Sequence, residues 1–165
     1  MKTYVITLSQ VFPVNHPKVG KSTRFAAKVL DTLNDQPSAD RIDIDYKRHT
    51  IRANYPLWAK RFEQIERGEA CLSIRQWTGK PYRSKQTEIA RLTKDDGIGL
   101  QKLVFPHDRD GMHSLSLFHI ENARDTTSVT LASNDGLSTP DWRDWFRTYD
   151  LSQPLAIIHF TKYRY

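Results

Sequence analysis

The chain has 165 residues, which is the length of one ordinary domain and is enough to bury a single hydrophobic core. Its composition, 38% hydrophobic and 27% charged, is typical of a globular protein, and no run approaches the ~20 apolar residues that cross a bilayer. A single cysteine, Cys71, excludes an internal disulfide framework and a cysteine-based zinc site. We therefore expect one cytoplasmic domain over residues 1–165.

Basic residues are concentrated in one part of the sequence. The whole chain carries 25 Lys and Arg against 19 Asp and Glu, a formal net charge of +6. Residues 47–94 contain twelve basic and four acidic residues, so this segment alone has a charge of +8. A concentrated positive charge favours an anionic partner such as nucleic acid, because Lys and Arg neutralise phosphates and release counterions. The alternative is a basic, solvated surface without a partner.

The first half of the chain alternates between predicted strands and helices. Thr3–Phe12 is predicted to be a strand, and Ser22–Leu33 a helix whose apolar residues recur at helical spacing. A polar segment, Asn34–Asp40, is expected to be a loop. Thr50–Arg52 is placed in a strand or at a strand end, and Leu57–Arg67 is predicted to be a second helix.

The second half is dominated by predicted strands. Alternating polar and apolar residues predict strands at Ala70–Trp77, Gln86–Leu92 and Ile98–Phe105, and shorter ones at Leu115–Ile120 and Ser128–Leu131.

The remaining residues predict a third helix and a closing strand. The helix should be capped by Thr139, with Pro140 in its first turn, and Leu155–Tyr165 forms the last β-prone run. Many short strands with three helices indicate an α+β domain built around a partly closed β-barrel with about three flanking helices.

Two glycine-containing segments resemble phosphate-binding motifs but are incomplete. Gly20-Lys21-Ser22-Thr23 precedes a predicted helix, yet Asn15 stands where the first glycine of a phosphate loop belongs. Gly97-Ile98-Gly99 lacks a third glycine and is interpreted as a turn. The six histidines show no metal-binding spacing, so we expect neither a metal nor a cofactor.

A basic turn with aromatic residues follows the strand that ends at Trp77. Four candidate nucleic-acid-binding residues lie in this turn: Lys80, Tyr82, Arg83 and Lys85. Two more, Arg75 and Trp77, lie at the end of the strand itself. Aromatic faces stack on bases, and basic residues bind phosphates. The alternative for Trp77 is a strand-end aromatic that covers the core.

The most informative string is Lys47-Arg48-His49-Thr50-Ile51-Arg52. A lysine three residues before a threonine can place an amine near a hydroxyl, and an arginine two residues later can hold an anion. Short strings of this kind also occur on protein surfaces, where they have no chemical role.

The HTIR string, the segment Gly79–Gln86 and two later segments together resemble the ASCH domains of the PUA-like superfamily, in particular small bacterial and phage members. The later segments are Ala132–Ser138, which enters an Asp-Trp-x-x-Trp-Phe helix, and Ile157–Thr161. The resemblance covers residues 47–91 and 132–165. It implies a β-barrel whose cleft binds RNA or a modified nucleoside.

One branch of that superfamily removes the acetyl group of N4-acetylcytidine with a lysine, a threonine and an acidic residue. The pattern K-x-x-T-I-R of that branch is similar to the string here and places its lysine on Lys47, its threonine on Thr50 and its arginine on Arg52. The acidic residue falls on Asp135, where the family has glutamate. The extra segments at 53–67 and 95–130 are further departures from the family pattern.

Three hypotheses follow. The first is an RNA- or nucleoside-binding module with a basic cleft, in which Lys47 and Arg52 bind phosphates. The second is an amidohydrolase acting on N4-acetylcytidine-like nucleosides, with Lys47, Thr50 and Asp135 as catalytic residues. The third is a protein-interaction domain of a mobile element. The sequence predicts no oligomeric state.

Overall fold

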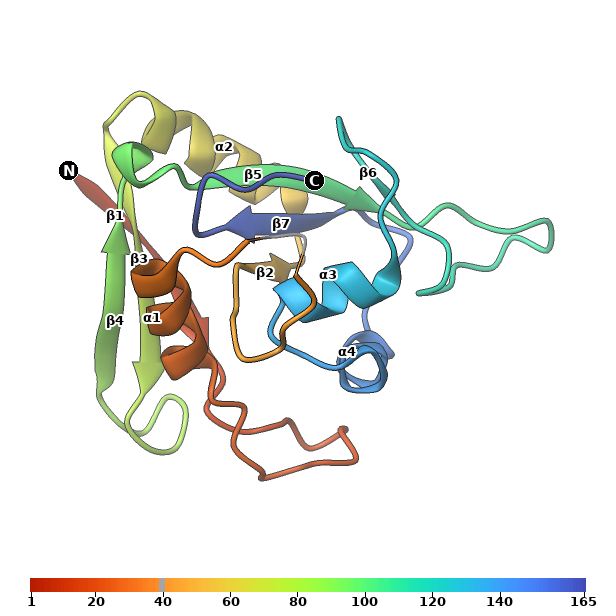
Figure 1. Cartoon of the computed structure of the whole chain (residues 1–165), viewed down its shortest axis with the longest axis horizontal. Coiled ribbons are helices and arrows are strands. Elements are labelled where there is room, and N and C mark those ends of the chain that lie inside the picture. Colours follow the sequence, from red (N-terminus) through yellow and green to blue (C-terminus); the bar gives the residue numbers. More distant parts are fainter. Residues whose placement is uncertain (39–40) are drawn as a thin grey trace.

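The computed structural model describes residues 1–38 and 41–165, and within them four α-helices accompany two β-sheets (Figure 1). The α+β class expected from the sequence is confirmed. The first sheet has the order β1-β3-β4, with β1 at Lys2–Leu8, β3 at Ala70–Trp77 and β4 at Gln86–Leu92. Strand β3 pairs with β1 in the parallel direction and with β4 in the antiparallel direction.

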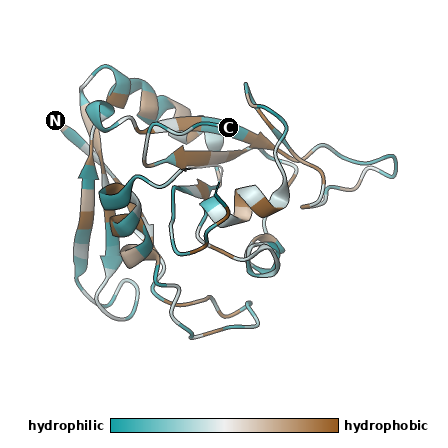
Figure 2. Ribbon diagram, viewed as in Figure 1, coloured by the Kyte–Doolittle hydropathy of each residue, from teal (hydrophilic) through white to brown (hydrophobic). Residues whose placement is uncertain are grey.

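The second sheet is antiparallel and has the order β2-β7-β5-β6. Its strands are β2 at His49–Arg52, β5 at Gly99–Val104, β6 at His119–Ile120 and β7 at Leu155–His159. The described residues thus form two separate sheets and no closed barrel. All five residues of β7 are buried, and the strand is strongly hydrophobic at the centre of the molecule (Figure 2).

The helices connect and cover the two sheets. Helix α1 is at Phe25–Asp35, α2 at Tyr55–Glu66, α3 at Ser128–Asn134 and α4 at Thr139–Phe146, with a short 3₁₀ helix at Lys94–Asp96. Helix α2 begins at its cap Asn54, whose side chain accepts a hydrogen bond from the backbone N–H of Leu57. It packs against β3 of the first sheet and against β5 and β7 of the second.

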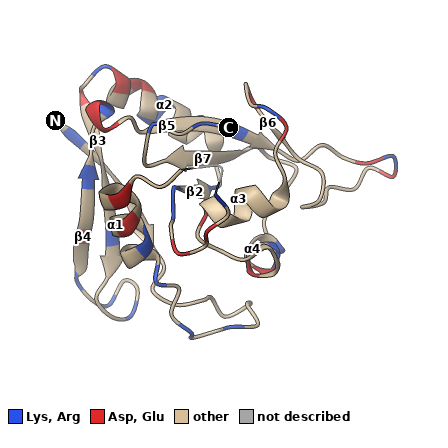
Figure 3. Cartoon of the chain, in the orientation of Figure 1, with Lys and Arg blue, Asp and Glu red and all other residues tan. Residues whose placement is uncertain are grey.

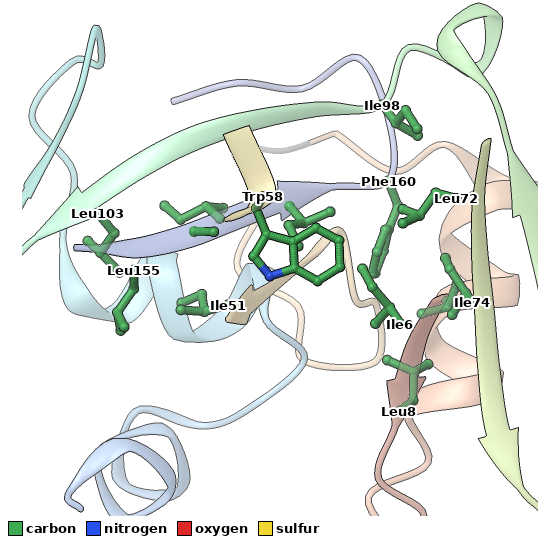
Figure 4. Packing of buried hydrophobic residues seen from close by; sticks show 14 of the residues in the cluster. Ile6, Leu8, Ile51, Trp58, Leu72, Ile74, Ile98, Leu103, Leu155 and Phe160 are labelled. Carbon is green, nitrogen blue, oxygen red and sulfur yellow. The ribbon is translucent and has the colours of Figure 1, made fainter. Parts of the chain in front are cut away.

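One hydrophobic core joins the two sheets beneath α2. Trp58 lies at the centre of this core, between the apolar side chains of the two sheets (Figure 4). Ile6 and Leu72 contribute from the first sheet, and Ile157 and Leu103 from the second, all almost fully buried. Buried apolar side chains of both sheets thus belong to one cluster.

Several predicted elements differ from the structure. The strand predicted at Ser128–Leu131 is wrong: Thr127 accepts a hydrogen bond from the Thr130 N–H and begins α3 there. This helix brings the helix number to four rather than three. The predicted strand Leu115–Ile120 is reduced to its last two residues.

The boundaries of other elements shift by a few residues. Strand β1 ends at Leu8 instead of Phe12, and α4 is capped by Ser138 instead of Thr139. The predicted loop at Asn34–Asp40 is shortened by α1, and its residues 39–40 lie outside the described part of the chain. No helix of the described residues has the length and apolar character needed to span a membrane.

Candidate functional site

A buried ion pair joins two segments far apart in the sequence. The Lys47 ammonium donates a hydrogen bond to the Asp135 carboxylate, Nζ to Oδ1, at 2.5 Å, and a second to the Asp135 backbone oxygen at 2.6 Å. Both side chains are at most 4% exposed. The Lys47 Nζ also lies 4.1 Å from the centre of the Phe25 ring, where a cation is attracted by the aromatic face.

Backbone contacts hold the pair in place. The Lys47 N–H donates to the Thr32 hydroxyl oxygen at 2.9 Å, which ties the segment before β2 to α1. Asp135 ends α3, and Gly136 follows it with φ +78°, a conformation that favours glycine. A Cβ at Gly136 would lie 3.2 Å from the Lys47 Cβ and 3.3 Å from the Tyr46 carbonyl oxygen. The glycine therefore permits the close approach of the two segments.

Strand β2 presents Thr50 and Arg52 on one face, because alternate residues of a strand point to the same side. Thr50 is 5% exposed, and its hydroxyl makes no hydrogen bond among residues 1–38 and 41–165. The Arg52 guanidinium donates to the Thr7 carbonyl oxygen at 2.8 Å. Its Nε is buried without a hydrogen-bond partner among the same residues, so a donor is left available.

Lys47, Thr50, Arg52 and Asp135 line one cavity of about 100 Å³. The other lining residues come from the end of β1, from α1, from β2 and from the region of α4; they are Thr7, Leu8, Ser9, Phe25, Ile51, Leu137, Trp145, Phe146 and Tyr149. The cavity is far smaller than the ~300–1,000 Å³ pockets that enclose whole drug-sized ligands. It has room for a small polar group rather than for a folded nucleic acid.

Burial changes the proton affinities of the pair. It lowers the pKa of the Lys47 amine, and the nearby Asp135 carboxylate opposes this only in part. Burial likewise raises the pKa of Asp135 against the opposing effect of Lys47. Because the two pKa values move toward each other, transfer of the shared proton from lysine to aspartate costs less here than in water. Burial also lowers the pKa of Arg52.

Six of the predicted binding residues do not line this cavity, although Arg75 pairs in the first sheet with Thr7, which does. Arg75 and Trp77 are at the end of β3, and the loop that follows carries the other four: Lys80, Tyr82, Arg83 and Lys85. The β3–β4 loop has basic and no acidic residues (Figure 3). Tyr82 is 90% exposed, and its ring centre is 5.3 Å from that of Trp77. The predicted site is thus divided between a buried cavity and a separate basic loop.

Sequence reasoning assigns no role to several residues around the pair. His49 lies within the quoted string, and its Nδ1 is 3.9 Å from the Asp135 Oδ1. Tyr165, Asn134 and Arg48 continue from His49 as a buried row of hydrogen bonds. The sequence signal for His49 is its place in the HTIR string, whereas Tyr165 is 116 positions away and gives none.

No three His, Cys, Asp or Glu side chains gather as metal ligands within the described ranges. Comparison of the chain with protein-family models, with curated proteins and with solved structures found no match. Function is therefore inferred from the geometry of the cavity and from the resemblance of the motifs.

Proposed function

We propose that the chain is an amidohydrolase that removes a small acyl group from the exocyclic amine of an N4-acylcytidine-type nucleoside. The observation that carries the proposal is that Lys47, Thr50, Arg52 and Asp135 line one small cavity. The resemblance to ASCH domains places the family's catalytic lysine, threonine and acidic residue on Lys47, Thr50 and Asp135, and its trailing arginine on Arg52. The PUA-like relationship and the cytoplasmic location belong to the proposal. The buried, unpaired Cys71 suits a reducing compartment.

The resting chain holds the Lys47–Asp135 ion pair, and in the proposed reaction its shared proton first passes from Lys47 to Asp135, which leaves a neutral amine and a carboxylic acid. The Thr50 oxygen bonds to the acyl carbon while its proton passes to the Lys47 amine. The C–N bond then breaks, and Asp135 gives its proton to the leaving nitrogen. Lys47 and Asp135 are left as ammonium and carboxylate, the charged state of the hydrogen-bonded pair described above, and Thr50 carries the acyl group as an ester.

Water completes the cycle. The Asp135 carboxylate takes a proton from water as the water oxygen attacks the ester carbon. The Lys47 ammonium returns a proton to the Thr50 oxygen as the ester bond breaks. The net reaction converts amide and water into carboxylic acid and amine, and the pair regains the neutral state from which Thr50 attacks. Burial lowers the pKa of Lys47 and raises that of Asp135, so proton transfer between them costs less than in water, which supports this exchange.

Arg52 is the group best placed to bind the acyl oxygen. It lines the cavity and has a buried Nε–H without a partner among the described residues. A donor aimed at an oxygen that gains negative charge stabilises the transition state, and removing such a donor costs ~10²–10³ in kcat. The small cavity volume supports an acetyl-sized acyl group, with the base and sugar outside.

A second candidate function has its own observation, the basic β3–β4 loop. Lys80, Arg83 and Lys85 lie in the same loop as Tyr82, whose ring is tilted against that of Trp77, and no acidic residue interrupts them. Basic side chains bind phosphates and exposed aromatic rings stack on bases, so this loop suits a single-stranded RNA. RNA binding here and acyl removal in the cavity are compatible. The third hypothesis, a protein-interaction domain of a mobile element, requires neither the basic loop nor the cavity.

Incubation with N4-acetylcytidine tests the proposal, with cytidine release measured by chromatography. We expect turnover by the wild-type chain, its loss in Thr50→Ala, and partial activity in Thr50→Ser, which keeps a hydroxyl. Arg83→Ala is the matched control outside the cavity and should retain activity. Absence of cytidine release from a folded wild-type chain, or full activity of Thr50→Ala, would contradict the proposal.

A further inference from the structure

Behind Asp135 lies a row of buried polar side chains that the proposed reaction does not use. The Arg48 Nη1 donates to the Asn134 Oδ1 at 3.1 Å, and the Asn134 Nδ2 donates to the Tyr165 hydroxyl oxygen at 3.0 Å. The Tyr165 hydroxyl is 2.6 Å from the His49 Nε2. Arg48, Asn134 and His49 are each at most 1% exposed. The row ends at His49, whose Nδ1 is 3.9 Å from the Asp135 Oδ1.

Arg48 fixes the direction of the hydrogen bonds in this row as far as Tyr165. A guanidinium only donates, so the Asn134 oxygen faces Arg48 and its amide nitrogen faces Tyr165. An amide nitrogen also only donates, so the Tyr165 oxygen accepts from Asn134. The hydroxyl proton of Tyr165 is then free to be donated to the His49 Nε2.

The contacts of His49 favour one of its two tautomers. Burial, with the nearby His159, holds the pKa of His49 well below its ordinary value, so the ring is neutral and carries one proton. A proton on Nδ1 faces the Asp135 carboxylate and leaves Nε2 to accept the Tyr165 hydroxyl proton. A proton on Nε2 would instead turn the Nδ1 lone pair toward that carboxylate, so the Nδ1 tautomer is favoured. The Nδ1 has no hydrogen-bond partner in the part of the chain the structure describes. The Asp135 Oδ1 lies 3.9 Å from it.

We infer that the row Arg48–Asn134–Tyr165–His49 serves as a positioning device that holds an N–H of His49 ready for the Asp135 carboxylate. The catalytic part of this inference rests on the proposed function. When Asp135 gives its proton to the leaving amine, negative charge develops on its oxygens. The His49 N–H then shortens its 3.9 Å separation from Oδ1 and stabilises that charge. His49 acts through Asp135 and does not touch the substrate.

Tyr165 is held from its backbone as well as from its hydroxyl. The Gln101 Oε1 accepts from the Tyr165 N–H at 3.0 Å and lies 2.9 Å from the His159 Nε2. Hydrogen bonds at both the backbone and the hydroxyl of Tyr165 limit the movement of the phenol and keep its proton directed at His49. The titratable and charged groups that face His49 are Lys47, Arg48, Asp135, His159 and Tyr165.

Nuclear magnetic resonance of the full chain labelled with ¹⁵N-histidine tests the tautomer without any substrate. We expect His49 to carry its proton on Nδ1 in the wild-type chain, and Tyr165→Phe to shift it toward the Nε2-protonated form. Tyr4→Phe is the matched control, because it removes a phenol that donates to the Gln64 Oε1 at 2.7 Å instead. Protonation of Nε2 in the wild-type chain, or an unchanged tautomer in Tyr165→Phe, would overturn the inference.

A titration of the Asp135 carboxyl by ¹³C resonance tests the link to the site, again without turnover. Loss of the facing N–H destabilises the carboxylate, so the pKa of Asp135 should be higher in Tyr165→Phe than in the wild type. An unchanged titration would overturn the positioning role. Because both resonance experiments need no substrate, they separate failure of this inference from failure of the proposed amidohydrolase.

Activity gives the last comparison, with N4-acetylcytidine as the probe. An asparagine side chain places its amide near the position of the imidazole Nδ1, whereas a glutamine amide reaches the position of Nε2. We expect His49→Asn to retain most of the kcat and His49→Gln to lose roughly 10- to 100-fold, the rate equivalent of one hydrogen bond to a charged group, with KM little changed. Equal loss in two folded variants would count against His49 as the positioning residue.

Discussion

Replacing Lys47 with methionine removes the charge that compensates the buried Asp135 carboxylate. Methionine has a similar length and no charge, so the substitution changes electrostatics more than packing. Breaking a buried ion pair by removing one partner costs ~3–5 kcal/mol, because the other charge stays buried and unpaired. The Asp135 side chain is 4% exposed, which places this pair in that class. For a chain of this length the decrease in stability corresponds to a decrease in Tm of roughly 6–20 °C.

The size of this effect should depend on pH through Asp135. Burial raises the pKa of Asp135 above its unfolded value, and removal of Lys47 takes away the largest opposing effect, leaving those of Arg52 and Trp142. The folded state of Lys47→Met therefore binds a proton more strongly than the unfolded state does. Its stability is fully present below the unfolded pKa of ~3.9 and falls as pH rises through the folded pKa.

The double variant Lys47→Met with Asp135→Asn is the matched control, because asparagine has the shape of aspartate without its charge. Urea unfolding at neutral and acidic pH measures both variants. We expect the double variant to be several kcal/mol more stable than Lys47→Met at neutral pH, and the difference to shrink as the pH approaches ~4. Equal stability of the two variants at neutral pH would refute the reasoning that Asp135 is buried as a charge.

Two further substitutions test the frame of the site and the basic loop. Gly136→Ala should destabilise the chain by ~1–2 kcal/mol in thermal unfolding, because alanine is strained at the positive φ of this position. It should also lower activity by displacing Lys47. Unchanged stability and unchanged activity would contradict the close approach of Gly136 to Lys47. Arg83→Ala and Lys85→Ala should each reduce the salt slope of single-stranded RNA binding by ~0.7 for each phosphate that the variant no longer binds, with Tm unchanged. An unchanged salt slope in both variants would show that the β3–β4 loop does not bind RNA.

The parts of the fold that are predictable from the sequence depend on local pattern. Ala70–Trp77 and Gln86–Leu92 alternate clearly and form β3 and β4 with the predicted bounds. Ser128–Leu131 misleads because Val129 and Thr130 favour strands, whereas the Thr127 cap and the packing of α3 on α4 favour a helix. Here the cap and the tertiary packing outweigh local preference.

The candidate site is predictable only where its residues lie in one string. Lys47, Thr50 and Arg52 are close in sequence and are found together, and Asp135 is reached through the family resemblance. Tyr165 is missed because its hydrogen bond with His49 spans 116 positions and has no local signal. The separation of the basic loop from the cavity is also beyond sequence reasoning, since it depends on how the two sheets pack.

A trapped acyl group on Thr50 tests the central claim most directly. The chain is mixed with N4-acetylcytidine, quenched in acid during turnover, and digested for mass spectrometry. We predict one acetyl group on the peptide that contains Thr50, and its absence in Thr50→Ala. Release of cytidine with an acetyl group on another residue, or neither adduct nor cytidine, would contradict the proposed role of Thr50.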